Sequence, residues 1–277
     1  MKLYRYYLAS KGIAAITHNR LYLTPPEFFN DPFEFAPASA RDLTDQEIAA
    51  HIKTRHHRDI VRQALTELGV YTGTKRAFPQ WLVINFDTLF PILRKRFRGA
   101  AAEIESTFTK IVSRHFVVCC FSKSPDNLLM WSHYAKSHEG MVVAYEINAK
   151  LFPNGTLAQV AYSADRVKVE PLFFASTAPF DKSIMRTMLT KSTDWEYEHE
   201  YRVVLPIKDC ISEQRPNGTY YYLGLPPSST LEVIVGARCS DLTIAAVREA
   251  CRQYPNVTTN RAFLSKTRFA IDFGSME

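Results

Sequence analysis

The apolar and polar residues of this chain follow two different spacings. Short apolar stretches of strand length recur near both ends, whereas a long stretch in the first half repeats apolar residues at helical spacing. Strands are predicted at 3–7, 21–23, 116–122, 140–147, 158–162, 196–206, 220–223, 231–235 and 269–273. Helices are predicted at 10–19, 127–137, 183–189 and 241–253, with Ser10 and Ser240 as N-caps. Because strands and helices do not alternate as they do in βαβ units, the order favours an α+β fold with a mainly antiparallel core.

Residues 42–115 are distinguished by their helical periodicity. Thr44, followed three residues later by Glu47, is typical of a capping box at the start of a helix. The periodicity continues as far as Leu68, and further helices are predicted around 81–97 and 100–113. We therefore expect a single α+β domain over residues 1–277, with a helical insertion at 42–115 that acts as a lid or as a partner-binding subdomain.

Composition narrows the class of protein. The chain has 277 residues, of which 46% are hydrophobic and 13% aromatic, and this excludes wholesale disorder. No apolar run reaches the ~18 residues of a membrane span, and the first residues do not resemble a signal peptide. We expect a cytoplasmic protein that does not bind membranes. The five cysteines have no spacing typical of zinc or redox sites, so we predict buried cysteines and no metal.

The charge distribution leaves two interpretations open. The formal net charge is +6, and basic residues cluster at 53–62 and 94–98. Such clusters are usually solvated helix faces, and the alternative is a polyanionic partner such as RNA or DNA.

The sharpest candidate for chemistry is an acidic segment near residue 200. If the segment is extended, Glu196, Glu198 and Glu200 lie on one face of a strand together with Arg202. Three like charges in a row repel one another unless Arg202, a metal ion or a cationic ligand compensates them. The alternative is a solvent-facing edge strand protected by charge. The apolar residues 203–205 that follow favour an inner strand.

Two further motifs combine aromatic and polar residues. In the predicted helix 127–137, Met130, Trp131 and Tyr134 share a face, which is typical of core packing. His133 on this helix has no nucleophile elbow beside it, so a hydrolase triad is not expected. The segment 28–34 places Asn30 among aromatic residues, as either an ordinary turn or a wall on which a base stacks.

Four motifs together resemble a bacterial family known only as a domain of unknown function. They are residues 3–6 (LYRY), 29–34 (FNDPFE), 120–122 (CFS) with 130–135 (MWSHYA), and 195–202 (WEYEHEYR). They span the chain outside the helical insertion, but the family itself implies no activity.

The order of these motifs is similar to that of ADP-ribosyltransferases of the arginine–serine–glutamate type. Arg5 matches the arginine of the first strand, and Ser122 begins a Ser-Lys-Ser sequence where that pattern has Ser-Thr-Ser. Glu198 and Glu200 match the Glu-x-Glu pair, with 203–206 (VVLP) downstream. The resemblance implies a split, mainly antiparallel β core and an NAD-dependent mono-ADP-ribosyltransferase, a toxin or phage-defence effector in which NAD is a substrate.

The resemblance also implies roles for individual residues. Arg5 would hold a phosphate or ribose of NAD, and Ser122 would support the nicotinamide ribose. Glu200 would stabilise the cation left as nicotinamide departs, and Glu198 would orient or deprotonate the acceptor. The remaining NAD-binding residues would be Tyr6, Phe29, Asn30 and Tyr134. The acceptor, a protein or a nucleic acid, is left open.

Geometry can test these roles. We expect Arg5, Ser122 and Glu200 to line one cleft, and Glu198 or Glu200 to have a perturbed pKa. One alternative is a non-catalytic nucleotide- or partner-binding module, such as an antitoxin-binding protein. A second is a metal-dependent nuclease in which Glu196, Glu198 and Glu200 converge on Mg²⁺.

Overall fold

The computed structural model describes residues 1–39, 42–169 and 182–276, and the chain divides into two compact units. The first unit contains Met1–Phe35, Thr109–Arg166 and Met185–Glu277, and the second contains Ala36–Phe108 and Val167–Ile184. The second unit thus takes in a later segment besides most of the predicted insertion.

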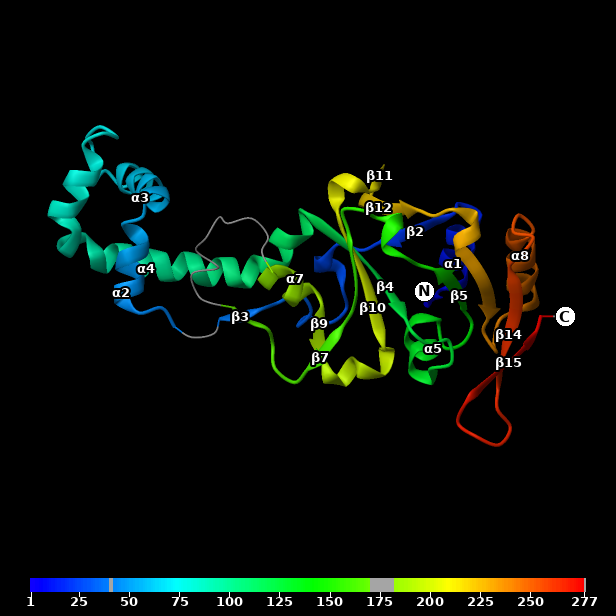
Figure 1. The fold of residues 1–277 in the computed structure, drawn as a ribbon. Coiled ribbons are helices and arrows are strands. Elements are labelled where there is room, and N and C mark those ends of the chain that lie inside the picture. The colour runs from blue at the N-terminus through cyan, green and yellow to red at the C-terminus, as the bar shows by residue number, and fades with distance from the viewer. Residues whose placement is uncertain (40–41, 170–181, 277) are drawn as a thin grey trace. The chain divides into compact units, whose positions relative to one another are not determined.

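An eight-stranded sheet forms the body of the first unit, with strand order β15-β14-β13-β5-β1-β4-β10-β6 (Figure 1). Its strands in chain order are β1 (Lys2–Tyr7), β4 (Phe116–Ser122), β5 (Met141–Glu146), β6 (Thr156–Gln159), β10 (Glu200–Pro206), β13 (Thr230–Val235), β14 (Thr258–Leu264) and β15 (Ile271–Ser275). Neighbouring strands are antiparallel except for β13 and β14, which are parallel. The predicted α+β class with a mainly antiparallel sheet is therefore confirmed.

Shorter elements surround this sheet. A three-stranded antiparallel sheet consists of β2 (Arg20–Leu23), β12 (Gly218–Gly224) and β11 (Ile211–Arg215). A parallel pair consists of β7 (Ala161–Ser163) and β9 (Thr190–Ser192), which follows α7 (Lys182–Met188). Short 3-10 helices are η1 (Pro26–Phe28), η2 (Ala149–Leu151), η3 (Thr193–Glu198), η4 (Ile207–Asp209) and η5 (Pro227–Ser229).

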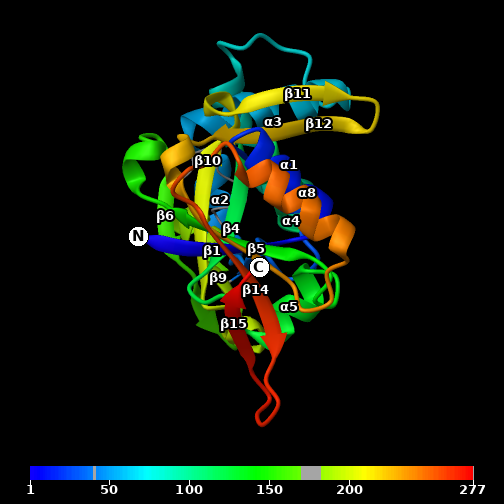
Figure 2. The same cartoon turned by 90° about the vertical axis from the view of Figure 1, so that its right-hand side faces the viewer.

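The two faces of the large sheet bury different side chains. Helices α1 (Ala9–Thr17) and α8 (Asp241–Cys251) lie side by side (Figure 2) and share a core with Leu3 and Val143. On the other face, α5 (Leu128–Tyr134) packs Trp131 against Tyr6 and Val142. This alternation follows from strand geometry, since successive residues point to opposite faces.

Strands β1 and β4 meet at one end and then diverge. Their register is a single pair, Tyr4 opposite Ser122. By contrast, β1 pairs with β5 over its whole length, and β4 pairs with β10 from Ser122 to Phe116. Side chains rather than backbone hydrogen bonds therefore fill the space between β1 and β4, and this is where the candidate site lies.

Several element boundaries differ from the sequence-based predictions. The strand predicted at 196–206 begins only at Glu200, because residues 193–198 form η3. Leu8 rather than Ser10 precedes α1, without a side-chain cap, whereas Ser240 caps α8 as predicted. The predicted strand 158–162 is divided between β6 and β7, and the predictions omitted β9, β11 and β14.

The second unit is built on α2 (Asp45–Ile52), α3 (Arg55–Glu67) and α4 (Phe78–Ser113) as far as Phe108, with β3 (Ala38–Ser39) parallel to β8 (Lys168–Val169). The Thr44–Glu47 capping box is present as predicted. Helix α4 is one continuous helix that includes Pro91, whereas separate helices were predicted around 81–97 and 100–113. Its Phe78, Leu82 and Phe86 form the core of this unit with Ile48. No helix in the described part of the chain is long and apolar enough to cross a bilayer.

Candidate functional site

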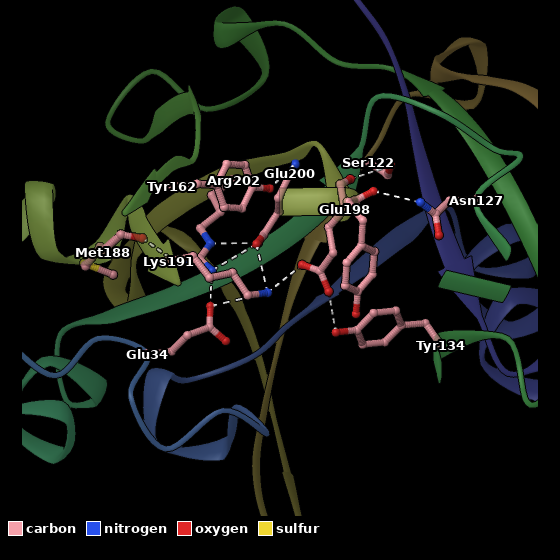
Figure 3. A network of polar contacts seen from close by, with 11 residues as sticks. Glu34, Ser122, Asn127, Tyr134, Tyr162, Met188, Lys191, Glu198, Glu200 and Arg202 are labelled. Atoms are coloured by element: carbon pink, nitrogen blue, oxygen red, sulfur yellow. Dashed lines mark hydrogen bonds and ion pairs between the residues drawn. The ribbon is translucent and has the colours of Figure 1, made fainter. Parts of the chain in front are cut away.

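A buried network of charged side chains lies where β10 meets β4 (Figure 3). Glu200 and Arg202 alternate along β10, so they point to the same face, opposite Ser122 and Cys120 of β4. Glu198 ends η3, and Lys191 lies in the short strand β9. The chain thus brings together residues from three neighbouring elements, and their charges must compensate one another because they are shielded from water.

Arg202 is fully buried and contacts two carboxylates. Its Nε donates to Glu200 Oε1 at 2.7 Å, and its Nη2 donates to Glu200 Oε2 at 3.0 Å. Nη2 also forms an ion pair with Glu34, and Nη1 donates to the carbonyl of Met188 at 2.7 Å. The guanidinium lies over the ring of Phe35, 4.9 Å from its centroid. Every nitrogen of this guanidinium therefore has a partner, as a buried arginine requires.

Lys191 is the second cation of the network and lies among three carboxylates. Its Nζ is 2.5 Å from Glu198 Oε2 and 3.2 Å from Glu200 Oε2. A third carboxylate, that of Glu34, is 3.8 Å away. Two cations thus face three carboxylates, so the network either carries one net negative charge or binds one proton.

The two glutamates of the Glu-x-Glu motif have pKa values shifted in opposite directions. Burial alone would raise the pKa of Glu200, but the charges of Arg202 and Lys191 outweigh it and lower this pKa to about 2. For Glu198, burial outweighs Lys191 and raises the pKa above its usual value. Burial likewise raises the pKa of Glu34, against the opposing charge of Arg202. The expectation that one of the two motif glutamates is perturbed is confirmed for both.

Further hydrogen bonds hold Glu198 and the start of β10 in place. Tyr134 donates its hydroxyl to Glu198 Oε1 at 2.6 Å, and Ser122 Oγ donates to the Glu198 carbonyl at 2.7 Å. The backbone N–H of Glu200 donates to the hydroxyl of Tyr162 at 2.8 Å. His199 between the two glutamates has a φ of 45°, the left-handed conformation that reverses the chain after η3.

Glu196 does not share the face of Glu198 and Glu200, contrary to the prediction. Ser192 caps η3, so the segment before His199 is helical, and Glu196 is exposed. The carboxylate that joins Glu198 and Glu200 is Glu34. A nuclease site built on Glu196, Glu198 and Glu200 is therefore wrong, and cations already lie between the buried carboxylates. Among the described residues, no group of three His, Cys, Asp or Glu side chains is arranged to hold a metal ion.

A cavity of about 430 Å³ opens beside the network, within the first unit. All the residues predicted to bind NAD or to act in catalysis line it: Arg5, Tyr6, Phe29, Asn30, Ser122, Tyr134, Glu198 and Glu200. These residues come from motifs that are far apart in the sequence. The expectation that Arg5, Ser122 and Glu200 line one cleft is therefore confirmed.

Arg5 nevertheless occupies a different face from Glu200. Tyr4 pairs with Ser122, which pairs with Glu200, so these three side chains share a face and Arg5 points to the other. Its Nη1 contacts Cys119 Sγ at 2.7 Å, and its guanidinium lies over the Tyr7 ring. Arg5 reaches the cavity where β1 and β4 diverge. The match of Arg5 to the arginine of the ADP-ribosyltransferase pattern requires it on the same side of the sheet as Glu200. The strand register therefore contradicts the predicted role of Arg5 in holding a phosphate or ribose of NAD beside Glu200.

Two members of the network were not predicted from the sequence as site residues. Glu34 ends the FNDPFE motif, so the motif itself could have indicated it. Lys191 lies outside every motif, and no local pattern distinguishes it from a surface lysine. Only the pairing of β9 with β7 brings it to the carboxylates.

In comparisons with protein-family models, curated proteins and solved structures, nothing matches this chain significantly.

Proposed function

We propose that the protein binds NAD in this cavity and transfers ADP-ribose from it to an acceptor. The observation that carries the proposal is the pair Glu198 and Glu200, adjacent carboxylates on one cavity whose pKa values are shifted in opposite directions. Environments that separate two carboxylate pKa values are typical of sites where one group transfers a proton and the other stays charged.

The cavity has features suited to the nicotinamide ribose end of NAD. Its volume of about 430 Å³ lies in the range of small-molecule sites. Tyr6, Phe29 and Tyr134 offer aromatic surface for the ring, while Ser122 and Asn30 offer polar groups. Glu34 lines the same cavity, and its buried Oε2 has no hydrogen-bond partner among the described residues. A hydroxyl or amide of a ligand would satisfy this acceptor.

In the proposed reaction each of the two glutamates has a separate role. The bond between ribose C1′ and the nicotinamide nitrogen breaks, and nicotinamide leaves with the bonding electron pair. Glu200 remains ionised at neutral pH and stabilises the positive charge that develops on the ribose. A nucleophile of the acceptor then bonds to C1′ and releases a proton, which Glu198, the more basic carboxylate, accepts and passes to water.

The test measures nicotinamide release and transfer of labelled ADP-ribose from NAD to lysate protein and nucleic acid. We expect Glu200→Gln to lower the rate on the order of 100-fold or more, because a neutral amide cannot stabilise the cation as a carboxylate does. Glu196→Gln is the matched control, since this exposed glutamate lies in the same segment outside the network. Wild-type protein that consumes no NAD, or a Glu200→Gln variant as active as the Glu196→Gln variant, would overturn the proposal.

One observation favours a second candidate, a non-catalytic nucleotide-binding module. Both carboxylate oxygens of Glu200 already accept hydrogen bonds from Arg202, and its side chain is only 3% exposed. In this case calorimetry would detect NAD binding, but no nicotinamide would be released. The Glu196→Gln and Glu200→Gln variants would then differ only in their stability. The proposed role as a toxin or defence effector, with an antitoxin or other partner protein, is supported by the motif resemblance alone.

A further inference from the structure

A second cavity, of about 450 Å³, adjoins the first within the same unit. The two cavities share three lining residues, Arg5, Tyr6 and Tyr134. The second is bounded by the first strand and helix and by the three-stranded sheet of β2, β12 and β11. The shared residues place this second cavity next to the Glu198 site, with Tyr134 lining both.

The three-stranded sheet presents a tyrosine-rich face to this cavity. Tyr22 pairs with Tyr222, and strand alternation places Tyr220 on the same side. The intervening residues, such as Leu21 and Leu223, point the other way into the apolar core. Because one face of the sheet is fixed by the core, the tyrosines of the other face must line the cavity. The ring centroids of Tyr22 and Tyr220 are 5.8 Å apart, so they form one aromatic surface.

The charges around this aromatic surface are mainly positive. Arg20, Arg215 and Lys11 line the cavity together with Arg5. Glu213 forms ion pairs with Arg20 and Arg215 and so neutralises part of this charge. No carboxylate lines the cavity within the part of the chain that the structure describes. The remaining positive charge favours an anionic ligand.

Two of the arginines are already positioned on the tyrosines. The Arg20 guanidinium lies 3.9 Å from the centroid of the Tyr222 ring, and that of Arg215 lies 4.7 Å from the centroid of Tyr220. Arg215 Nη2 also donates to the Tyr222 hydroxyl at 2.9 Å. Each guanidinium covers one side of a tyrosine ring, so a base can stack only on the aromatic surface that the arginines leave open. The N–H groups that do not contact Glu213 or Tyr222 can donate to a phosphate.

We infer that the second cavity binds single-stranded nucleic acid, with a base on the tyrosine face and a backbone phosphate at Arg20 or Arg215. Stacking platforms combined with a positive groove are the general means of holding single strands without sequence specificity. The cavity adjoins the Glu198 site, so a bound strand lies where an acceptor is needed. The identification of nucleic acid as the acceptor rests on the proposed function. The binding of a single strand in this cavity does not.

The experiment measures binding of a fluorescent oligonucleotide of about 12 nucleotides, RNA or DNA, by anisotropy. It uses the wild-type protein without NAD, so the result does not depend on whether the proposed transferase activity exists. We expect affinity to fall as salt rises, because phosphate contacts release counterions. Tyr220→Leu and Arg215→Ser should each weaken binding about tenfold, while Tyr220→Phe, which keeps the aromatic face, should bind nearly as wild type does.

The matched control tests the other basic surface of the chain. Lys95 and Arg96 are exposed on α4, and the double variant Lys95→Ala, Arg96→Ala should leave binding unchanged. Binding that is lost in this control and retained in Tyr220→Leu would overturn the inference. Absence of oligonucleotide binding by the folded protein would do the same. If AMP alone binds as tightly as the oligonucleotide, the cavity holds a free nucleotide and the strand proposal is wrong.

Discussion

Two neighbours in β10, Arg202 and Val203, are equally inaccessible to water, yet the two faces of the sheet on which they lie are built differently. Val203 points into an apolar core with Cys119 and Leu205. Arg202 points to the opposite face, where Glu200 and Glu34 surround it. Around β10 both faces exclude water, but only the face of Arg202 does so with ion pairs, whereas Arg5 on the other face contacts Cys119 and the Tyr7 ring.

The difference shows what each face can tolerate. On the apolar face a truncated side chain loses contacts in proportion to the surface it buried. On the charged face the loss of one partner leaves the opposite charge buried and unpaired, which costs more than the lost interaction itself. The network therefore fixes the positions of the site side chains but tolerates substitution of them poorly. Such a fixed arrangement is expected where neighbouring carboxylates must keep different protonation states.

The largest expected effect comes from removing the central cation. Arg202→Met should lower the free energy of unfolding by about 4 kcal/mol, because Glu34 and Glu200 lose their closest positive charge in a dry environment. Urea denaturation measures it. Arg202→Lys should recover only part of the loss, since an ammonium cannot reproduce the paired contacts with Glu200. If Arg202→Met lowers the free energy of unfolding no more than Val203→Ala does, the two faces do not differ in their tolerance of substitution.

Acid should selectively weaken the charged face. The pKa of Glu200 is lowered from 4.5 to about 2, so its contribution to stability is present above pH 4.5 and is lost as the pH falls toward 2. The shift corresponds to about 3 kcal/mol. We expect the difference in unfolding free energy between wild type and Glu200→Gln to shrink by that amount between about pH 5 and pH 2.

The carboxylates of Glu34 and Glu198, whose pKa values burial raises, titrate in both proteins of that comparison. Their folded forms hold protons at higher pH than the unfolded chain does, so their contribution falls as the pH rises above 4.5. Both proteins contain Glu34 and Glu198, so subtracting their unfolding free energies reduces the pH dependence that these two carboxylates contribute. A difference that stays constant from pH 5 to pH 2 would contradict the assignment of Glu200 as the strongly acidic member.

A smaller effect is expected on the apolar face. Val203→Ala removes two methyl groups from the core and should cost about 2 kcal/mol of unfolding free energy. The cost should be nearly independent of pH, since no charge is exposed or unpaired. Urea denaturation across the same pH range checks this. A pH-dependent loss in Val203→Ala would indicate that the two faces are coupled through β10.

The smallest expected effect concerns the hydroxyl of Tyr134. Tyr134→Phe removes the hydrogen bond to Glu198 Oε1 and should cost about 1 kcal/mol, because Lys191 still pairs with Glu198. The same bond lowers the Glu198 pKa, so its loss should move the Glu198 titration to higher pH. Carboxyl NMR shifts of Glu198 measure the change. An unchanged titration would show that Tyr134 does not influence the protonation of Glu198.

Local sequence patterns were sufficient for several elements. Continuous apolar stretches of strand length predicted β4 and β5, and cap residues predicted the starts of α2 and α8. These features depend on neighbours within a few positions, so a single sequence contains them. The motifs also indicated which residues would line the first cavity, although they are far apart in the chain.

The tertiary structure alone decided how those residues work together. The helical turn of η3 displaced Glu196 from the site, because Ser192 caps it and His199 reverses the chain. Strand register placed Arg5 on the face opposite Glu200, and pairing of β9 with β7 brought Lys191 to the carboxylates. Composition and spacing do not specify such partners, because the energy of a buried charge depends on groups that only the folded chain brings within a few ångströms.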